Sequence, residues 1–209
     1  MKKNNEDMLS LNVKDFISRI AAKSPVPGGG SVAGVTGALA AALGEMSLNF
    51  TRGKKKYAQW AEFHNHLAGR LERIRGMFLD LVYDDMSAYG MYSETSELED
   101  GPGKKEKMEL AVAAAIDVPL EMSKLALALL DDLLEFSDKC NQHLVSDLVA
   151  AATLAHSTVV LCDLNVRINA GQLDPGQAAE LRKSSNANRK RAADLAEKIE
   201  ANTRQYLQE

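Results

Sequence analysis

One aspartate lies where the sequence pattern calls for an apolar side chain. Between residues 57 and 92, apolar side chains recur at steps of three and four, the spacing of one buried helical stripe: Leu71, Ile74, Phe78, Leu81, Ala88 and Tyr92. Asp85 falls on this stripe, whereas Asp84 falls beside it, toward solvent. A carboxylate on such a stripe costs free energy unless it is paired, hydrogen-bonded or lining a cavity. Asp85 is therefore the candidate catalytic residue. The structural alternative is that Asp85 accepts hydrogen bonds from a buried helix end or pairs with a buried arginine.

Two motifs flank a helix predicted from Ser31 to about Thr51. The first, Pro27-Gly28-Gly29-Gly30-Ser31, offers bare backbone at a helix start, where free N–H groups can bind an anion or a carbonyl. A tight turn between helices is the alternative, because no strand precedes the glycines as a nucleotide-binding loop requires. The second, Thr51-Arg52-Gly53-Lys54-Lys55-Lys56-Tyr57, is basic and is either an anion site or a solvated surface. A ligand bound by both motifs must be extended and carry an anionic end.

A third polar group, Asn141, Ser146 and Asp147, stands at the start of the fifth helical region, where these side chains either bind a ligand or cap the helix. The histidines form no set with metal-binding spacing, and no Glu-x-x-His pair exists. Cys140 and Cys162 are far apart and belong to no Cys-x-x-Cys motif. We therefore expect no metal site and no disulfide framework.

The elements that must position these residues all read as helices. Helical spacing covers residues 13–21, 31–51, 57–92, 106–136, 144–169 and the chain after Pro175, and no alternating β-branched run suggests a strand. Pro119 predicts a kink or a break, and residues 93–105 read as a surface loop. The fold class expected is all-α, with residues 1–209 forming one bundle of long helices. The small and apolar surface of residues 31–51 and 57–92 exceeds what one bundle needs, which predicts a homodimer or larger oligomer.

Composition narrows the class of protein further. The chain has 209 residues, of which 45% are hydrophobic and 26% charged, and its net charge of −4 gives no bias toward nucleic acid. The polar N-terminal residues do not resemble a signal peptide. The uncharged stretch 24–44 is interrupted by prolines and glycines, so no membrane span is expected. Two isolated cysteines suit a reducing compartment, which predicts a cytoplasmic location.

Taken in order along a helical chain, these motifs resemble the cyclodeaminase/cyclohydrolase family. The residues that carry the resemblance are Pro27-Gly-Gly-Gly-Ser31, Thr51-Arg-Gly-Lys-Lys-Lys-Tyr57, Asp85-Met-Ser-Ala-Tyr89, Asn141 and Ser146-Asp147. The family comprises the C-terminal cyclodeaminase domain of formimidoyltransferase-cyclodeaminase and stand-alone methenyltetrahydrofolate cyclohydrolases. The resemblance implies an all-helical, dimeric folate enzyme whose essential aspartate matches Asp85. Two departures stand out: Tyr83 replaces a second acidic residue, and Cys140 replaces a glycine.

The resemblance also suggests roles for the motifs. Gly28, Gly29, Gly30 and Ser31 would lie beside the pterin ring. Lys54 and Lys56 would hold the carboxylates of a glutamate or polyglutamate tail, and Tyr57 is a further candidate substrate-binding residue. Asn141, Ser146 and Asp147 would contact the pterin or the bridging nitrogens. The expected reaction is hydrolysis of 5,10-methenyltetrahydrofolate to 10-formyltetrahydrofolate, with no cofactor beyond the folate. We favour it because the chain carries no transferase domain that would supply a formimino group. The alternatives are formimidoyltetrahydrofolate cyclodeamination with release of ammonia, and a non-catalytic helical interaction protein, which Tyr83 keeps open.

Overall fold

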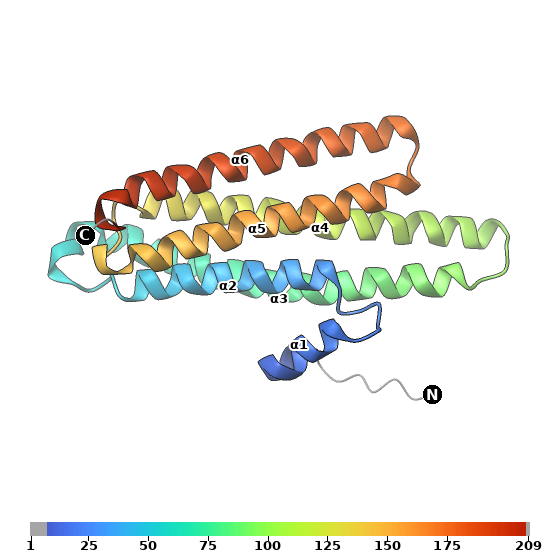
Figure 1. The fold of residues 1–209 in the computed structure, drawn as a ribbon, viewed down its shortest axis with the longest axis horizontal. Helices are drawn as coiled ribbons and strands as arrows, with labels where there is room; N and C mark the ends of the chain where they lie inside the picture. The colour runs from blue at the N-terminus through green and yellow to red at the C-terminus, as the bar shows by residue number, and fades with distance from the viewer. Residues whose placement is uncertain (1–7, 208–209) are drawn as a thin grey trace.

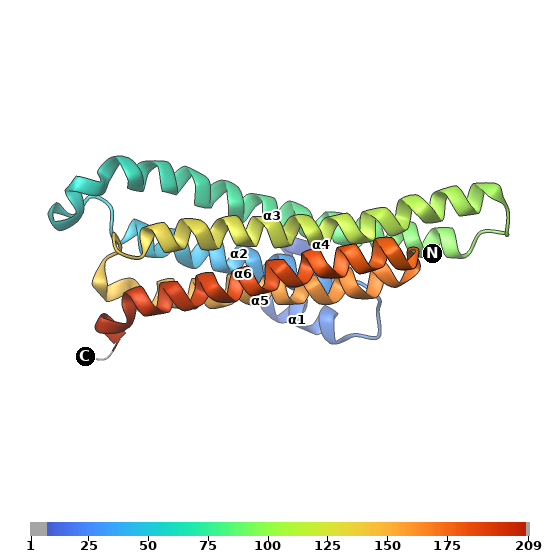
Figure 2. The ribbon, with the colours of Figure 1, turned by 90° about the horizontal axis from the view of Figure 1, so that it is seen from above.

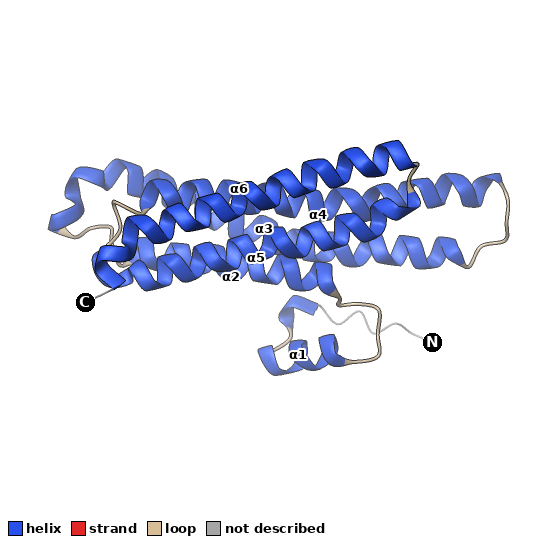
Figure 3. Ribbon diagram, turned by 45° about the horizontal axis from the view of Figure 1, so that its top comes forward, coloured by secondary structure: helices blue, strands red, loops and turns tan. Residues whose placement is uncertain are grey.

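The computed structural model describes residues 8–207, which form a bundle of five long helices with a short helix beside it (Figure 1). In chain order these are α1 (Val13–Ala21), α2 (Gly29–Asn49), α3 (Ala61–Ser96), α4 (Pro102–Phe136), α5 (Val145–Asn169) and α6 (Pro175–Leu207). Short 3-10 helices cover Met8–Ser10, Lys55–Trp60, Gln142–Leu144 and Ala170–Gln172. Residues 8–207 contain no strand, which confirms the all-α class (Figure 3).

Helices α2, α3, α4 and α5 pack around a shared core, and α6 lies outside them. Helix α2 lies against α3 and α5, α4 lies against α3 and α5, and α6 covers α5 and α4. The hairpin between α3 and α4 extends beyond the other helices at one end of the bundle (Figure 2). It is tighter than the sequence suggested, because α3 continues to Ser96 and α4 already begins at Pro102.

Helix α2 approaches α3 closely because its inner face carries glycine. A Cβ atom added at Gly34 would lie 2.6 Å from Cγ2 of Val82, and one at Gly37 would lie 2.5 Å from Cε1 of the Phe78 ring. Phe78, Val82 and Leu71 of α3 are fully buried. The stripe predicted for residues 71–88 therefore faces α2, and the absent side chains of α2 set the spacing between the two helices.

Pro119 predicted a kink or a break, and helix α4 passes through it without ending, so the break does not occur. A proline in a helix has no N–H for the carbonyl four residues earlier, which here is Ala115. The side-chain amide of Asn169 on α5 donates to that Ala115 carbonyl at 2.6 Å. The acceptor freed by the proline is thus satisfied by the neighbouring helix.

Helix α6 is fastened to α5 by a buried carboxylate. Asp163 of α5 is 1% exposed and accepts hydrogen bonds from Ser185 Oγ at 2.7 Å and Arg189 Nη1 at 3.0 Å, both on α6. Arg167 adds a third donor from α5 itself at 2.8 Å. The pKa of Asp163 is lowered because these donors outweigh the burial that would raise it.

Two helical stretches, Gly29–Asn49 and Gln142–Gln172, are long and apolar enough to cross a membrane. Their apolar windows are 56% and 39% buried inside the bundle, where α2 and α5 pack against each other. A core helix of a water-soluble bundle has the same composition, so these stretches are weak evidence for a membrane.

The α2–α3 contact makes a stability prediction. Gly37→Ala should lower the free energy of unfolding by about 1–3 kcal/mol, because the new methyl group overlaps the Phe78 ring. Gly76→Ala is the matched control: its Cβ meets nothing within 4 Å, and alanine favours a helix over glycine by up to about 1 kcal/mol. Urea unfolding followed by circular dichroism measures both. Equal stability of the two variants would contradict the close packing described above.

Candidate active site

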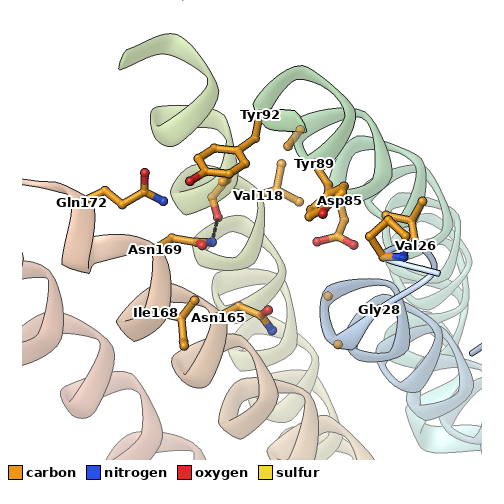
Figure 4. Close-up of a pocket in the computed structure, with 15 residues that line it drawn as sticks. Val26, Gly28, Asp85, Tyr89, Tyr92, Val118, Asn165, Ile168, Asn169 and Gln172 are labelled. Atoms are coloured by element: carbon orange, nitrogen blue, oxygen red, sulfur yellow. Dashed lines mark hydrogen bonds between the residues drawn. The ribbon is translucent and has the colours of Figure 1, made fainter. Parts of the chain in front are cut away.

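A cavity opens at the N-terminal end of α2, where the loop before this helix meets α3, α4 and α5 (Figure 4). Its volume is about 380 Å³. It is lined by Pro25, Val26, Gly28, Gly29, Gly30, Asp85, Ala88, Tyr89, Tyr92, Ala115, Val118, Asn165, Ile168, Asn169 and Gln172. Asp85 is the one charged side chain among these described lining residues, so its carboxylate dominates the electrostatics of the cavity.

Asp85 is held against the first turn of α2. The hydroxyl of Ser31 donates to Oδ2 of Asp85 at 2.9 Å, and the Ser31 backbone N–H donates to the same carboxylate. The carboxylate thereby occupies the end of α2 where N–H groups lack helical partners, while the cap residue Gly28 supplies no side-chain hydrogen bond. Asp85 therefore combines the two interpretations left open by the sequence, since it receives hydrogen bonds from a helix end and also lines a cavity.

Gly30 leaves the space that Asp85 fills. A Cβ atom at this position would overlap the Asp85 carboxyl group, and the nearest neighbours of one at Gly29 would be the amide atoms of Asn165 at 3.8 Å. Any side chain larger than hydrogen at residue 30 would push Asp85 away from Ser31. The absence of a side chain at Gly30 thus allows the Asp85 carboxylate to reach the end of α2. The backbone of the glycine motif lines the cavity beside this carboxylate.

Burial raises the pKa of Asp85 above the usual range of an aspartate. The two hydrogen bonds from Ser31 act in the opposite direction but only partly offset the loss of hydration. Among the described residues, no arginine or lysine forms an ion pair with this carboxylate. A carboxyl group with a raised pKa can take up and release a proton nearer neutral pH, as general acid–base catalysis requires.

The basic motif and the asparagine motif lie together at the other end of α2. Lys56 Nζ donates to Oε1 of Gln142 at 2.8 Å, and the backbone N–H of Gln142 donates to the Tyr57 hydroxyl at 3.3 Å. Asn141 is buried; its backbone N–H donates to Thr51 Oγ1 and its side-chain amide to the Phe50 carbonyl. Asn141 thus ties the end of α2 to the start of α5.

Within one chain the structure does not bring these motifs to the Asp85 cavity. Helix α2 has 21 residues, which at 1.5 Å per residue separates its ends by roughly 30 Å. Lys54 and Ser146 are exposed and Asp147 is half-buried, all near the far end. Of the site residues predicted from the sequence, the cavity assembles Gly28, Gly29, Gly30 and Asp85, with Ser31 directly behind the carboxylate.

Helix α5 contributes a wall of the cavity that was not predicted from the sequence. Asn165 and Asn169 lie one helical turn apart and project from α5 toward the side of the cavity occupied by Asp85 (Figure 4). The signal available in the sequence was their spacing of four residues, which places both asparagines on one side of a helix. Tyr83, the departure from the expected acidic residue, is 38% exposed and does not line the cavity.

Comparison with known proteins gives a consistent result. Residues 12–187 match the formiminotransferase-cyclodeaminase family. A methenyltetrahydrofolate cyclohydrolase from Methylorubrum extorquens is 31% identical over 177 residues, which are 81% of this chain and 84% of that protein. A formimidoyltransferase-cyclodeaminase from Dictyostelium discoideum is 25% identical over 93% of this chain, which corresponds to 36% of its own length.

A solved structure shares the fold over its whole length. The crystal structure of formiminotetrahydrofolate cyclodeaminase from Thermotoga maritima superposes with a TM-score of 0.87. The two sequences are 25% identical, and the match covers 96% of this chain and all of the other. The helical arrangement described above is therefore one that a known folate enzyme adopts.

The environment of Asp85 makes a prediction about stability and pH. Because the folded-state pKa is raised, ionised Asp85 costs folding free energy, and this cost is present at neutral pH. Asp85→Asn keeps an oxygen that can accept from Ser31 but removes the charge, so at pH 7 it should be at least as stable as the wild type. The difference should shrink as the pH falls through the raised folded-state pKa, and it should vanish below the usual pKa of aspartate, where the wild-type carboxyl is protonated in both states.

Asp84→Asn is the control, since Asp84 is exposed and its replacement should change stability little. Chemical denaturation at a series of pH values measures both variants. A clear loss of stability in Asp85→Asn at pH 7 would show that the charge serves the fold.

Proposed function

Because the chain belongs to the formiminotransferase-cyclodeaminase family, we propose that it hydrolyses 5,10-methenyltetrahydrofolate to 10-formyltetrahydrofolate. The observation that carries this proposal is the half-buried carboxylate of Asp85, which faces the cavity and forms no ion pair with a described lysine or arginine. The relative named methenyltetrahydrofolate cyclohydrolase, similar over most of both chains, supports this substrate.

Cyclodeamination of formimidoyltetrahydrofolate is the second candidate, and a specific observation favours it. The Thermotoga maritima protein that matches over its whole length carries the cyclodeaminase name. The absence of a transferase domain from the matched region therefore does not separate the two activities. Both reactions pass through a tetrahedral carbon bonded to two nitrogens and need a proton moved at nitrogen, so both suit the same carboxylate.

The hydrolysis starts from a cation. The one-carbon bridge of the methenyl substrate joins two nitrogens as a positively charged amidinium group, which the negative Asp85 would attract and stabilise. Water adds to the bridging carbon as its proton passes to the carboxylate, and a neutral tetrahedral centre forms. The bond from this carbon to N5 then breaks as N5 receives the proton from Asp85, which leaves the formyl group on N10. The net reaction consumes one water and releases one proton, and we expect no cofactor beyond the folate.

Ser31 and Gly30 prepare Asp85 for this role. The hydroxyl and backbone N–H of Ser31 fix the orientation of the carboxylate before substrate arrives, which reduces the reorganisation needed in the transition state. Gly30 allows that contact because a side chain there would overlap the carboxylate. Both residues act through Asp85 and are positioning residues in this scheme.

We further propose that a homodimer completes the site by supplying the basic end of α2 from a second chain. In one chain Lys54 and Lys56 lie roughly 30 Å from the cavity, at the opposite end of α2. Two chains paired in opposite directions about an axis near the middle of α2 would bring the basic turn of each toward the Asp85 cavity of the other. The anionic glutamate tail of the folate would then lie toward the partner's lysines.

An exposed apolar stripe along α2 supports this pairing. Leu39, halfway along the helix, is 54% exposed, and Phe50 just beyond its end is 56% exposed. Val32, Val35 and Leu43 lie at helical spacing along the same face and are partly exposed. Helix α1 stands apart from the bundle, with Val13 75% exposed and Ile17 58% exposed (Figure 1). Apolar surface of this extent is typical of subunit interfaces.

We place the protein in the cytoplasm, in contact with neither membrane nor nucleic acid. Both cysteines are buried and free, which suits a reducing compartment. The net charge of −4 gives the molecule no general attraction to nucleic acid or to anionic lipid.

Asp85→Asn should lower kcat for methenyltetrahydrofolate by on the order of 10²-fold or more, because the variant can neither accept the proton nor balance the cation. The decay of the methenyl absorbance measures the rate, and Asp84→Asn should retain wild-type activity. The formimino substrate, assayed separately, tells the two candidate activities apart. A fully active Asp85→Asn enzyme would contradict the catalytic role.

Lys54→Ala and Lys56→Ala should each raise KM and leave kcat nearly unchanged, because a charge that holds a remote carboxylate acts equally on ground and transition states. The effect should shrink for a substrate that lacks the glutamate tail. Lys183→Ala, an exposed lysine on α6, is the control. Unchanged KM in both variants would mean that the basic turn is only a solvated surface.

The homodimer predicts a mass of twice 22.7 kDa by light scattering at micromolar concentration. Leu39→Glu should shift the equilibrium toward the monomer, because it places like charges face to face across the proposed axis. A monodisperse wild-type monomer would exclude the completed site.

A further inference from the structure

Two asparagines on α5 face the cavity and have no part in the scheme above. Asn165 and Asn169 are both half-buried, and their spacing of four residues puts them on the same side of the helix. Neither belongs to the motifs that carry the family resemblance. Their side chains reach into the same cavity as Asp85 from the opposite wall (Figure 4).

The fold fixes which end of each amide faces the ligand. The Asn165 amide nitrogen donates to the Leu161 carbonyl at 2.9 Å, and the Asn169 amide nitrogen donates to the Ala115 carbonyl at 2.6 Å. A carbonyl can only accept, so in each case the nitrogen must face it and the amide oxygen must point elsewhere. For Asn169 the requirement is stringent, because Pro119 leaves the Ala115 carbonyl without its helical donor.

Both amide oxygens are therefore left as acceptors on the cavity wall. Within the described residues, no hydrogen bond is directed to Oδ1 of Asn165 or of Asn169. Together with the Asp85 carboxylate, the side chains of α3 and α5 offer the ligand an array of oxygen acceptors. These acceptors favour a ligand edge that presents N–H donors to them, and the Asp85 carboxylate disfavours an anionic one.

We propose that Oδ1 of Asn165 and Oδ1 of Asn169 accept hydrogen bonds from the N–H groups of the reduced pterin ring. This inference rests on the proposed function, since it names the part of the folate that the cavity recognises. The amino and ring N–H groups of a tetrahydropterin supply donors for these two acceptors. The α5 asparagines thus hold the ring, and Asp85 is left to meet the one-carbon bridge.

The test measures binding of 5-formyltetrahydrofolate, a ligand that carries the reduced pterin ring, by isothermal titration calorimetry. Asn165→Leu and Asn169→Leu keep nearly the same size but remove the acceptor, and each should weaken binding by roughly tenfold, the effect of one lost hydrogen bond. Asn188→Leu on α6 is the matched control, because Asn188 is also a half-buried helical asparagine but lies outside the cavity. It should bind like the wild type.

Two features keep the outcomes distinct. The hydrogen bond that Asn165 donates stays within α5, so Asn165→Leu breaks no hydrogen bond between helices among the described residues. Thermal unfolding will show whether Asn169→Leu is folded. If the wild type binds and both cavity variants bind as tightly as Asn188→Leu, the proposed contact with the pterin ring is wrong. If the wild-type protein binds no folate, the proposed function itself fails.

Discussion

The structure depends on the contact that glycine permits between α2 and α3. Gly34 and Gly37 let α2 lie directly against Val82 and Phe78, so the buried faces of α2 and α3 are in direct contact. Gly30 continues the same contact to the helix end, where the neighbour is the carboxyl group of Asp85. Core packing and the position of the reactive group therefore have one physical origin, which is the absence of side chains along one face of α2.

The charge of Asp85 shows how the fold and the chemistry compete. Burial disfavours the ionised carboxylate, and Ser31 supplies enough hydrogen bonding to keep it in place without cancelling that cost. A lysine or arginine partner would stabilise the ionised state, as the arginines around Asp163 do, but it would also neutralise the group that must attract a cationic substrate. Asp163, which is buried, is suited to holding helices together, and Asp85, which is half-buried at a cavity, is suited to proton transfer.

Much of this arrangement could be predicted from the sequence, because it depends on periodicity and on residue type. The apolar stripe of residues 71–88 placed Asp85 on the buried face, and the glycine motif marked the start of α2. The continuity of α4 through Pro119 could not be predicted, because the compensating donor comes from Asn169, 50 residues later in the chain. The distance between the basic turn and Asp85 also depended on the direction of α2, and motif order alone does not reveal whether both ends serve one cavity.

The hydrogen bond from Asn169 to the Ala115 carbonyl makes substitutions in α4 and α5 depend on each other. If Pro119 is replaced by a residue with an N–H, the carbonyl regains its own donor and the Asn169 amide is free to rotate. If Asn169 is lost while Pro119 remains, the Ala115 carbonyl at the cavity wall loses its hydrogen-bond donor. A substitution at residue 119 alone changes the hydrogen bonding of the cavity wall, and a substitution at residue 169 alone weakens α4. Among descendants of this chain, residues 119 and 169 should therefore be inherited and exchanged as a pair.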